Sequence, residues 1–295
     1  NSTDGSTSVV KATNTYSGTG GLHQVYLGLG WSPFKGFAIG VNAAYLWGDY
    51  SRSVINSYTD AYANTLSKYY TAEVHNYKLD FGMQYTQKIT KNDAITLGVT
   101  YGLGHKLSSD PKCQIISTNA QTAVADTATY SIGNGLELPH SYGVGLMWNH
   151  ANRWRVGADY TLQKWSSVAY PKFDTSTNSY ELVSGQFADR HKMTVGGEFC
   201  PDERSRSFFK RVHYRMGASY ATDYLKIKGQ NGPKEYSVSA GFGIPIVNGY
   251  NNRSLLNISA QWVRQDSKTF VTENSFRINI GLTFNERWFA KWKME

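Results

Sequence analysis

A His and a Ser at a suitable spacing could together carry out nucleophilic catalysis in this chain. The chain has 7 His, and none is followed two positions later by Ser, the spacing that places both side chains on one face of a strand. His140 and Ser141 are adjacent, so on a strand they point to opposite faces. The motifs G-x-S-x-G, H-E-x-x-H and the P-loop are absent from the sequence. The sequence therefore predicts a protein that is not an enzyme and has no catalytic residues.

Cysteine and glycine give equally weak signals for a metal or a cofactor. The 2 Cys, Cys113 and Cys200, are far apart and neither belongs to a C-x-x-C motif. No group of His has the spacing of metal ligands. The glycine run at residues 18–21 resembles a phosphate loop only in composition, because no helix N-terminus follows it. We therefore expect neither a metal nor another cofactor.

Charged side chains recur at every second position of several segments. In strands these positions share one face, which we expect to line the lumen of a closed sheet. Its charged members are Lys78, Asp80, Arg155, Asp159, Arg215 and Arg277, together with Lys192, Glu198 and Asp223. Two interpretations follow. Charges of both signs would brace the lumen through cross-strand pairs, in which Arg155 and Asp159 meet opposite charges on neighbouring strands, or they would line a polar path for permeation.

Composition limits the class of protein that carries these faces. The chain has 295 residues, a net charge of +8, 14% aromatic and only 18% charged residues. No apolar run reaches the roughly 18 residues that a membrane helix needs, which excludes a helical membrane protein. The cations are scattered apart from one cluster at residues 204–211, so we expect no nucleic-acid partner. A soluble all-β protein and an outer-membrane β-barrel remain.

The alternation of apolar with small or polar residues predicts twelve strands. In residues 94–107, for example, Ile95, Leu97 and Val99 alternate with Thr96 and Gly98. Many of these segments have about 10 residues, the length of a tilted membrane-spanning strand rather than of an average soluble one. The predicted strands are residues 8–17, 21–31, 37–50, 71–88, 94–107, 138–148, 153–165, 188–199, 211–224, 236–244, 254–264 and 275–284.

The connections between these strands alternate between short and long. Tight turns at residues 32–36, 90–93 and 149–153 alternate with long segments, a pattern typical of short periplasmic turns and longer outer loops. Aromatic residues also gather near strand ends, as in a membrane aromatic belt: Trp31, Trp47, Tyr85, Trp148, Trp154, Trp165 and Trp262. We therefore predict an all-β, antiparallel transmembrane β-barrel in a bacterial outer membrane, with residues 1–284 as the barrel and 285–295 as a periplasmic tail.

Aromatic residues outside the strands are candidates for binding a ligand or a partner. Two long outer loops contain the candidate residues Tyr58, Tyr62, Tyr69, Tyr170, Phe173 and Phe187. They would form an outer groove that captures an apolar ligand, or they would pack on each other or on a partner. The tail carries Trp288, Phe289 and Trp292, which would dock on a partner or lie among the inner headgroups.

Three stretches of the sequence resemble a known family. Residues 13–28 (TNTYSGTGGLHQVYLG), 33–37 (PFKGF) and 281–289 (GLTFNERWF) look like the OmpP1/FadL/TodX-type outer-membrane proteins of Bacteroidota. That resemblance implies a fourteen-stranded barrel with an N-terminal plug, which carries hydrophobic molecules across the outer membrane. Only twelve strands and no plug are readable here, so we expect the N-terminal part of the mature protein to be missing from this sequence.

Two functions are therefore expected ahead of a third, a polar porin. The first is passive transport of small hydrophobic molecules, as the resemblance implies. The alternative is a non-enzymatic barrel subunit of an outer-membrane protein assembly or secretion complex. The expected partners are outer-membrane lipids and lipopolysaccharide, together with either a hydrophobic small molecule or other outer-membrane or periplasmic proteins.

Overall fold

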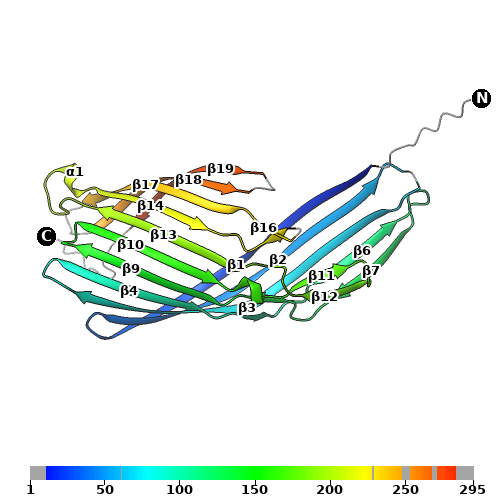
Figure 1. Ribbon diagram of the computed structural model, residues 1–295, viewed down its shortest axis with the longest axis horizontal. Coiled ribbons are helices and arrows are strands. Elements are labelled where there is room, and N and C mark those ends of the chain that lie inside the picture. Colours follow the sequence, from blue (N-terminus) through cyan, green and yellow to red (C-terminus); the bar gives the residue numbers. More distant parts are fainter. Residues whose placement is uncertain (1–10, 61, 228, 248–252, 268–270, 284–295) are drawn as a thin grey trace, which may run out of the picture.

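A single long antiparallel sheet forms most of the molecule (Figure 1). The computed structural model describes residues 11–60, 62–227, 229–247, 253–267 and 271–283. The principal strands, each paired with the next, are β1 (Ala12–Phe34), β2 (Phe37–Tyr58), β3 (Thr65–Lys88), β4 (Asp93–Gly102), β9 (Ser141–His150), β10 (Trp154–Gln163), β13 (Arg190–Phe199), β14 (His213–Ala221), β17 (Lys234–Val247), β18 (Arg253–Asp266) and β19 (Glu273–Thr283). This confirms the predicted all-β antiparallel architecture. No helix among the described residues is both long and apolar enough to cross a membrane.

The two faces of this sheet differ as the alternation predicts. Leu97 pairs with Leu146 and Val99 with Val144 across β4 and β9, and all four side chains are exposed on the outward face. The residues between them, such as Gly98, lie on the inward face. A row of exposed apolar side chains is expected where lipid, rather than water, covers the sheet.

The segment at residues 17–21, which separates two of the predicted strands, is instead part of β1. The predicted strands 8–17 and 21–31 therefore contribute one strand, and the path through the sheet has eleven strands rather than twelve. Gly20 (φ +119°) explains the difference, because a Cβ there would lie 2.3 Å from the carbonyl oxygen of Asp49. Because Gly20 has no Cβ, β1 passes this close approach to β2 without a break, and Gly20 stays in register with Tyr50.

The long segments predicted as outer loops are largely folded into strands. β6 (Lys112–Thr118) pairs with β3 and with β7 (Ala125–Ser131), and β11 (Tyr170–Asp174) pairs with β12 (Ser179–Val183). Figure 1 shows these strands together at one end of the sheet, which we call the loop end. Three smaller elements complete this end: β5 (His105–Leu107) with β8 (Leu136–Leu138), β15 (Lys226–Ile227) with β16 (Gln230–Asn231), and the 3-10 turn η1 (Trp165–Ser167).

Many of the buried apolar side chains lie at the loop end. Val74, Cys113, Val168, Phe173 and Phe187 are all buried there. The rest of the sheet has one face toward lipid and one toward the interior, so it has no comparable packed layer. The folded core thus belongs to the segments that had been expected to be loops.

The opposite end of the sheet, the turn end, has mostly tight connections. Residues 35–36, 89–92 and 151–153 make the short turns that were predicted there. The connection from β13 to β14 is longer and contains the short helix α1 (Phe208–Arg211). In outer-membrane barrels the short turns face the periplasm, so the turn end is the periplasmic end.

Candidate functional site

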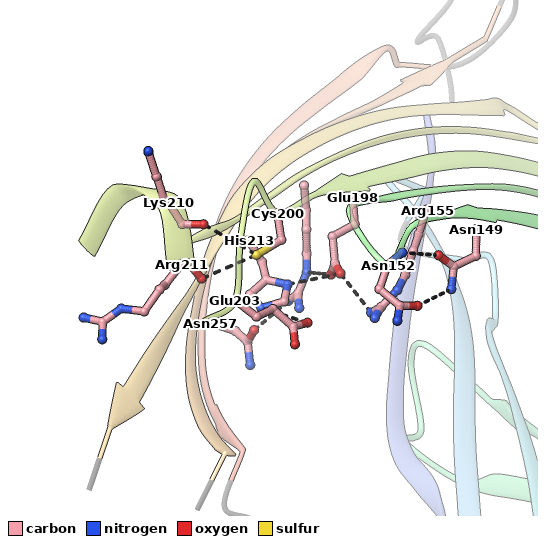
Figure 2. A network of polar contacts seen from close by, with 11 residues as sticks. Asn149, Asn152, Arg155, Glu198, Cys200, Glu203, Lys210, Arg211, His213 and Asn257 are labelled. Carbon is pink, nitrogen blue, oxygen red and sulfur yellow. Dashed lines mark hydrogen bonds and ion pairs between the residues drawn. The ribbon is translucent and has the colours of Figure 1, made fainter. Parts of the chain in front are cut away.

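A polar network lies on the inward face near the turn end. It consists of Arg155, Glu198, His213, Arg215 and Asn257, which we call the rim network (Figure 2). Arg155 on β10 stands directly opposite Glu198 on β13, and Glu198 stands opposite Arg215 on β14. Period-two alternation on each strand points these side chains the same way, and the register brings them side by side.

Glu198 is the centre of the rim network. Its Oε1 accepts a hydrogen bond from Arg155 Nη1 at 3.0 Å and lies 3.1 Å from His213 Nδ1, while its Oε2 accepts from Arg215 Nε at 2.6 Å. The Glu198 side chain is 17% exposed, whereas both Arg side chains are 39% exposed. One largely buried carboxylate therefore binds two guanidinium groups that are more exposed to solvent. Charge-assisted hydrogen bonds of this kind are stronger than those between neutral groups.

A bare position on β17 lets the network reach β18. Arg215 Nη1 donates to Asn257 Oδ1 at 2.6 Å, although β17 lies between their strands. Gly243 occupies the crossing point, where a Cβ would lie 3.3 Å from the Arg215 guanidinium. A Cβ at this position would crowd His213 and Arg215, so the glycine lets side chains from four strands, β10, β13, β14 and β18, share one network across β17.

The predicted lumen residues have three different outcomes. Arg155 meets the opposite charge expected on a neighbouring strand, whereas Asp159 does not: it lies opposite Gly145 and Thr194 and forms no salt bridge with another described residue. Lys78 and Asp80 pair with each other along β3 instead of across strands. Arg277 lies opposite Gln261 on β18, and no salt bridge joins it to the rest of the described chain.

His213 is a member of the network that the sequence analysis missed. It is the first residue of β14 and lies two positions before Arg215, so the alternation that placed Arg215 inward places His213 there as well. Its side chain is 9% exposed, and its Nε2 also lies 4.0 Å from Glu203 Oε1. The predicted strand 211–224 includes His213, so the alternation that found Arg215 could have found this residue too.

Part of the inward wall has no side chains. Glycines face each other across strands at Gly40 and Gly82 and again at Gly157 and Gly196. A groove of about 600 Å³ runs over β1 to β4, where small residues alternate with Asp80, Gln84 and Thr100. This part of the inward wall is therefore largely bare, with a few polar side chains between the glycines.

At the loop end, two of the predicted binding aromatics are buried against other aromatic side chains of the chain. Phe187 is buried against Trp165, Tyr170 and Tyr224, with ring centres 5.6–6.0 Å apart. Phe173 is buried too, and its ring centre lies 5.2 Å from that of Tyr130. Tyr70 and Tyr180, with ring centres 6.5 Å apart, join the two loops, which favours the interpretation in which the loops pack on each other.

The other predicted loop residues are more accessible. Tyr69 lies in β3 opposite Gln114, Tyr58 ends β2, and Tyr62 is 78% exposed. Nearby, burial and the neighbouring Cys113 thiol raise the pKa of Tyr180 well above its ordinary value. Burial likewise raises the pKa of Cys113, so that thiol stays protonated and packs as a small apolar group.

A salt bridge closes the base of the segment that carries β11 and β12. Lys164 Nζ lies 2.5 Å from Asp189 Oδ2, and the backbone N–H of Ser166 donates to Asp189 Oδ1 at 3.0 Å. Burial alone would raise the pKa of Asp189, but the bonds from Lys164 and Ser166 outweigh it and lower the pKa to about 2. Asp189 therefore remains charged and fixes both ends of this segment.

Two further predictions concern the tail and metal binding. Trp288, Phe289 and Trp292 lie outside the described residues. Within the described part of the chain, no group of three or more His, Cys, Asp or Glu side chains is placed to hold a metal ion.

Comparisons with solved structures show the fold of an outer-membrane β-barrel. The chain matches a CymD monoaromatic hydrocarbon channel with a TM-score of 0.53 and 13% identity, over 95% of this chain and 89% of that one. It matches the Ralstonia pickettii toluene transporter TbuX with a TM-score of 0.59 and 13% identity, over 92% of this chain and 68% of that one. A Pseudomonas aeruginosa FadL homologue gives 0.55 and 14%, over 84% of this chain and 60% of that chain.

These matches confirm the predicted fold and the outer-membrane location. The expected resemblance to FadL-type proteins therefore holds for the fold, and at such low identity it shows the fold alone. No match was found among curated proteins. The family is shown by the sequence itself, since a family model described as BamG matches residues 1–295. The chain belongs to the BamG family.

Proposed function

We propose that this protein is a non-enzymatic barrel subunit of an outer-membrane protein assembly or secretion complex. The observation that carries the proposal is the BamG match, because it covers the whole chain. The FadL-type likeness, at 13–14% identity, is a likeness of fold. A shared fold hosts many functions, so family membership is the more informative of the two.

The geometry is consistent with a barrel that supports other proteins. Glu198 and the two arginines join neighbouring strands on the inward face, which stiffens the wall. At the loop end Phe173 and Phe187 are buried inside the molecule itself. Their apolar surface is therefore engaged in holding the loop end together and is not available to an apolar ligand.

The experiment is to measure the native mass of the tagged protein after extraction from its own membrane in a mild detergent. We expect a complex of defined composition that contains other outer-membrane or periplasmic proteins. A harsher detergent, which separates subunits but leaves the barrel intact on a gel, is the control for non-specific association. A lone barrel under the mild conditions would contradict the proposal.

A second candidate function is passive transport of small hydrophobic molecules. The observation in its favour is the fold shared with a monoaromatic hydrocarbon channel and a toluene transporter. Its test is the uptake of toluene by cells with and without the protein. Transport is supported if the deleted strain takes up less toluene, the wild-type gene restores uptake, and the purified barrel retains a small apolar molecule. Normal uptake in the deleted strain excludes transport.

A further inference from the structure

The connection between β13 and β14 is unlike the described tight turns at the same end. It runs over residues 200–212, whereas the neighbouring connections occupy residues 35–36, 89–92 and 151–153. It presents two aromatic side chains, since Phe208 is 46% and Phe209 is 73% exposed. Their rings stand edge to face with centres 5.5 Å apart. Two adjacent exposed phenylalanines at the rim of a barrel indicate a surface that contacts a partner.

Hydrogen bonds hold this connection in a fixed shape. The backbone N–H of Asp202 donates to the carbonyl of Lys210 at 2.9 Å. The Cys200 thiol lies 3.8 Å and 3.7 Å from the carbonyls of Lys210 and Arg211. The Cys200 N–H donates to the carbonyl of Arg153 on the next turn at 2.8 Å. The phenylalanines are therefore presented by a constrained turn, which lowers the entropy cost of binding.

The outward charge of the connection is positive. Arg204, Arg206 and Lys210 are exposed, and none of them forms a salt bridge with another described residue. The two acidic residues are engaged locally: Asp202 Oδ1 accepts from the Arg204 N–H, and Glu203 lies 4.0 Å from His213. Figure 2 shows the side chains of Lys210 and Arg211 extending away from the rim network.

The connection lies against the lipid-facing side of the barrel. Tyr214 is on the outward face of β14, where its ring meets that of Phe242 on β17 at 5.8 Å. The Tyr214 hydroxyl donates to the carbonyl of Phe209 at 3.1 Å, which joins the connection to this face. Trp154 and Phe199 stack at 4.2 Å near the same strand ends. Aromatic rings in such positions mark the level of the lipid headgroups.

We propose that residues 200–212 form a membrane-docking surface for anionic phospholipid headgroups of the leaflet at the turn end. Phe208 and Phe209 enter between the headgroups, and Arg204, Arg206 and Lys210 bind their phosphates. Apolar burial combined with cations beside an anionic surface is the physical basis of interfacial binding. The docking surface would fix the height and the rotation of the barrel in the membrane, which goes beyond its proposed role as a subunit.

The first test counts the lipids that the purified barrel retains in native mass spectra after incubation with phosphatidylglycerol or phosphatidylcholine. We expect the wild type to prefer phosphatidylglycerol. Arg204→Gln/Arg206→Gln/Lys210→Gln should lower that retention by roughly a hundredfold, at about fivefold per cation. The matched control, Lys35→Gln/Lys91→Gln/Arg153→Gln, removes three exposed cations from the neighbouring turns. A heat-dependent gel shift shows that each variant has folded. Equal losses in both triple variants would overturn the proposal.

The second test places a spin label on the connection in vesicles of phosphatidylglycerol and phosphatidylethanolamine. Phe209→Cys is suitable because the native thiols, Cys113 and Cys200, are both buried. We expect the label at 209 to be more accessible to oxygen than to a water-soluble nickel complex, and a label at Lys91→Cys to be less so. A label at 209 that is fully accessible from water would overturn the proposal and would favour a soluble acidic protein as the partner.

Discussion

Glu198 is the residue that joins the charges of the rim network. It takes part in salt bridges with Arg155, Arg215 and His213, and it is more shielded from water than either arginine. Glu198→Ala would leave two guanidinium groups facing each other across β13. Removing one partner of a buried pair costs about 3–5 kcal/mol, but the arginines are partly wet, so we expect about 1–3 kcal/mol here.

Urea unfolding of the barrel in lipid vesicles measures this loss. Asp159→Ala is the matched control, because Asp159 is an inward carboxylate on β10 without a salt bridge to another described residue. We expect the control to change the unfolding free energy by less than about 0.5 kcal/mol. Equal effects of the two substitutions would show that the rim network adds nothing to stability.

Asp189 gives the loop end a defined acid sensitivity. Its folded pKa of about 2 is below the ordinary value of 3.8, so its contribution to stability is present above about pH 4 and is lost as the pH falls through about 2. Pepsin cleavage between residues 166 and 188 should therefore rise over that interval. Asp189→Asn should be cleaved readily even at pH 4, with little further change.

Glu181→Gln, on the exposed face of β12, is the control for this experiment. It removes a carboxylate from the same segment but not from the Lys164 contact. It should keep the pH dependence of the wild type. A wild type whose cleavage is already constant between pH 4 and pH 2 would contradict the assigned role of Asp189.

The charge pattern of the sequence predicted which face these residues occupy, but not which residues would meet. Alternation alone put Arg155, Asp159 and Arg215 inward, because a strand has a period of two. Partners depend on the register between strands, and a shift of two residues preserves the face while changing every neighbour. Arg155 therefore found Glu198 as its partner, whereas Asp159 came to lie over Gly145.

At the scale of elements, Gly20 allows β1 to approach β2 closely. A Cβ on Gly20 would lie 2.3 Å from the Asp49 carbonyl oxygen, whereas a Cβ on Gly21 would have no atom within 4 Å. Gly20→Ala should therefore strain the pairing of β1 with β2, by about 1–3 kcal/mol. Gly21→Ala, its adjacent control, should cost no comparable strain.

Hydrogen exchange of the backbone amides in residues 12–19 and 51–58 reports on this pairing. We expect faster exchange in Gly20→Ala than in Gly21→Ala, with no change in β9 and β10. Equal protection of these amides in the two variants would mean that β1 does not need glycine at position 20.

The same glycines explain why this element was divided in two from the sequence. A run of Gly and Ser is an ordinary signal for a loop, and residues 17–21 carry it. A strand that needs glycine because it lies close to its neighbour can carry the same run of Gly and Ser. The structure also shows β6, β7, β11 and β12 where loops were expected. These strands have only five to seven residues and pair as local hairpins, so their alternation is too short to distinguish them from a loop.

At the scale of the whole molecule, the directions of the two edge strands limit how the barrel closes. β1 and β19 end the path of the sheet, and each pairs on one side only among the described strands. β1 runs from the loop end into the turn at residues 35–36, and β19 also runs toward the turn end because it follows the antiparallel β18. Direct pairing of the two edges would therefore be parallel.

Lipid cannot satisfy the free backbone groups of an edge, and bacterial outer-membrane barrels close with an even number of antiparallel strands. With eleven strands on the path, antiparallel closure requires an odd number of additional strands from outside the described ones. A second copy cannot supply them, because copies with the same orientation in a membrane present edges that run the same way.

We therefore expect no disulfide between β1 and β19 in the native membrane. The measurement is disulfide trapping with Val25→Cys on β1 paired in turn with Phe276→Cys, Ile278→Cys and Ile280→Cys on β19, all on the outward face. Val25→Cys with Tyr45→Cys is the positive control, since these residues are opposite each other across β1 and β2. Efficient crosslinking to β19 would mean that the barrel closes with a parallel pair and would overturn the requirement for further strands. If the control crosslink forms and the β1–β19 crosslink does not, the edge of β1 is free to pair with a strand that runs in the opposite direction.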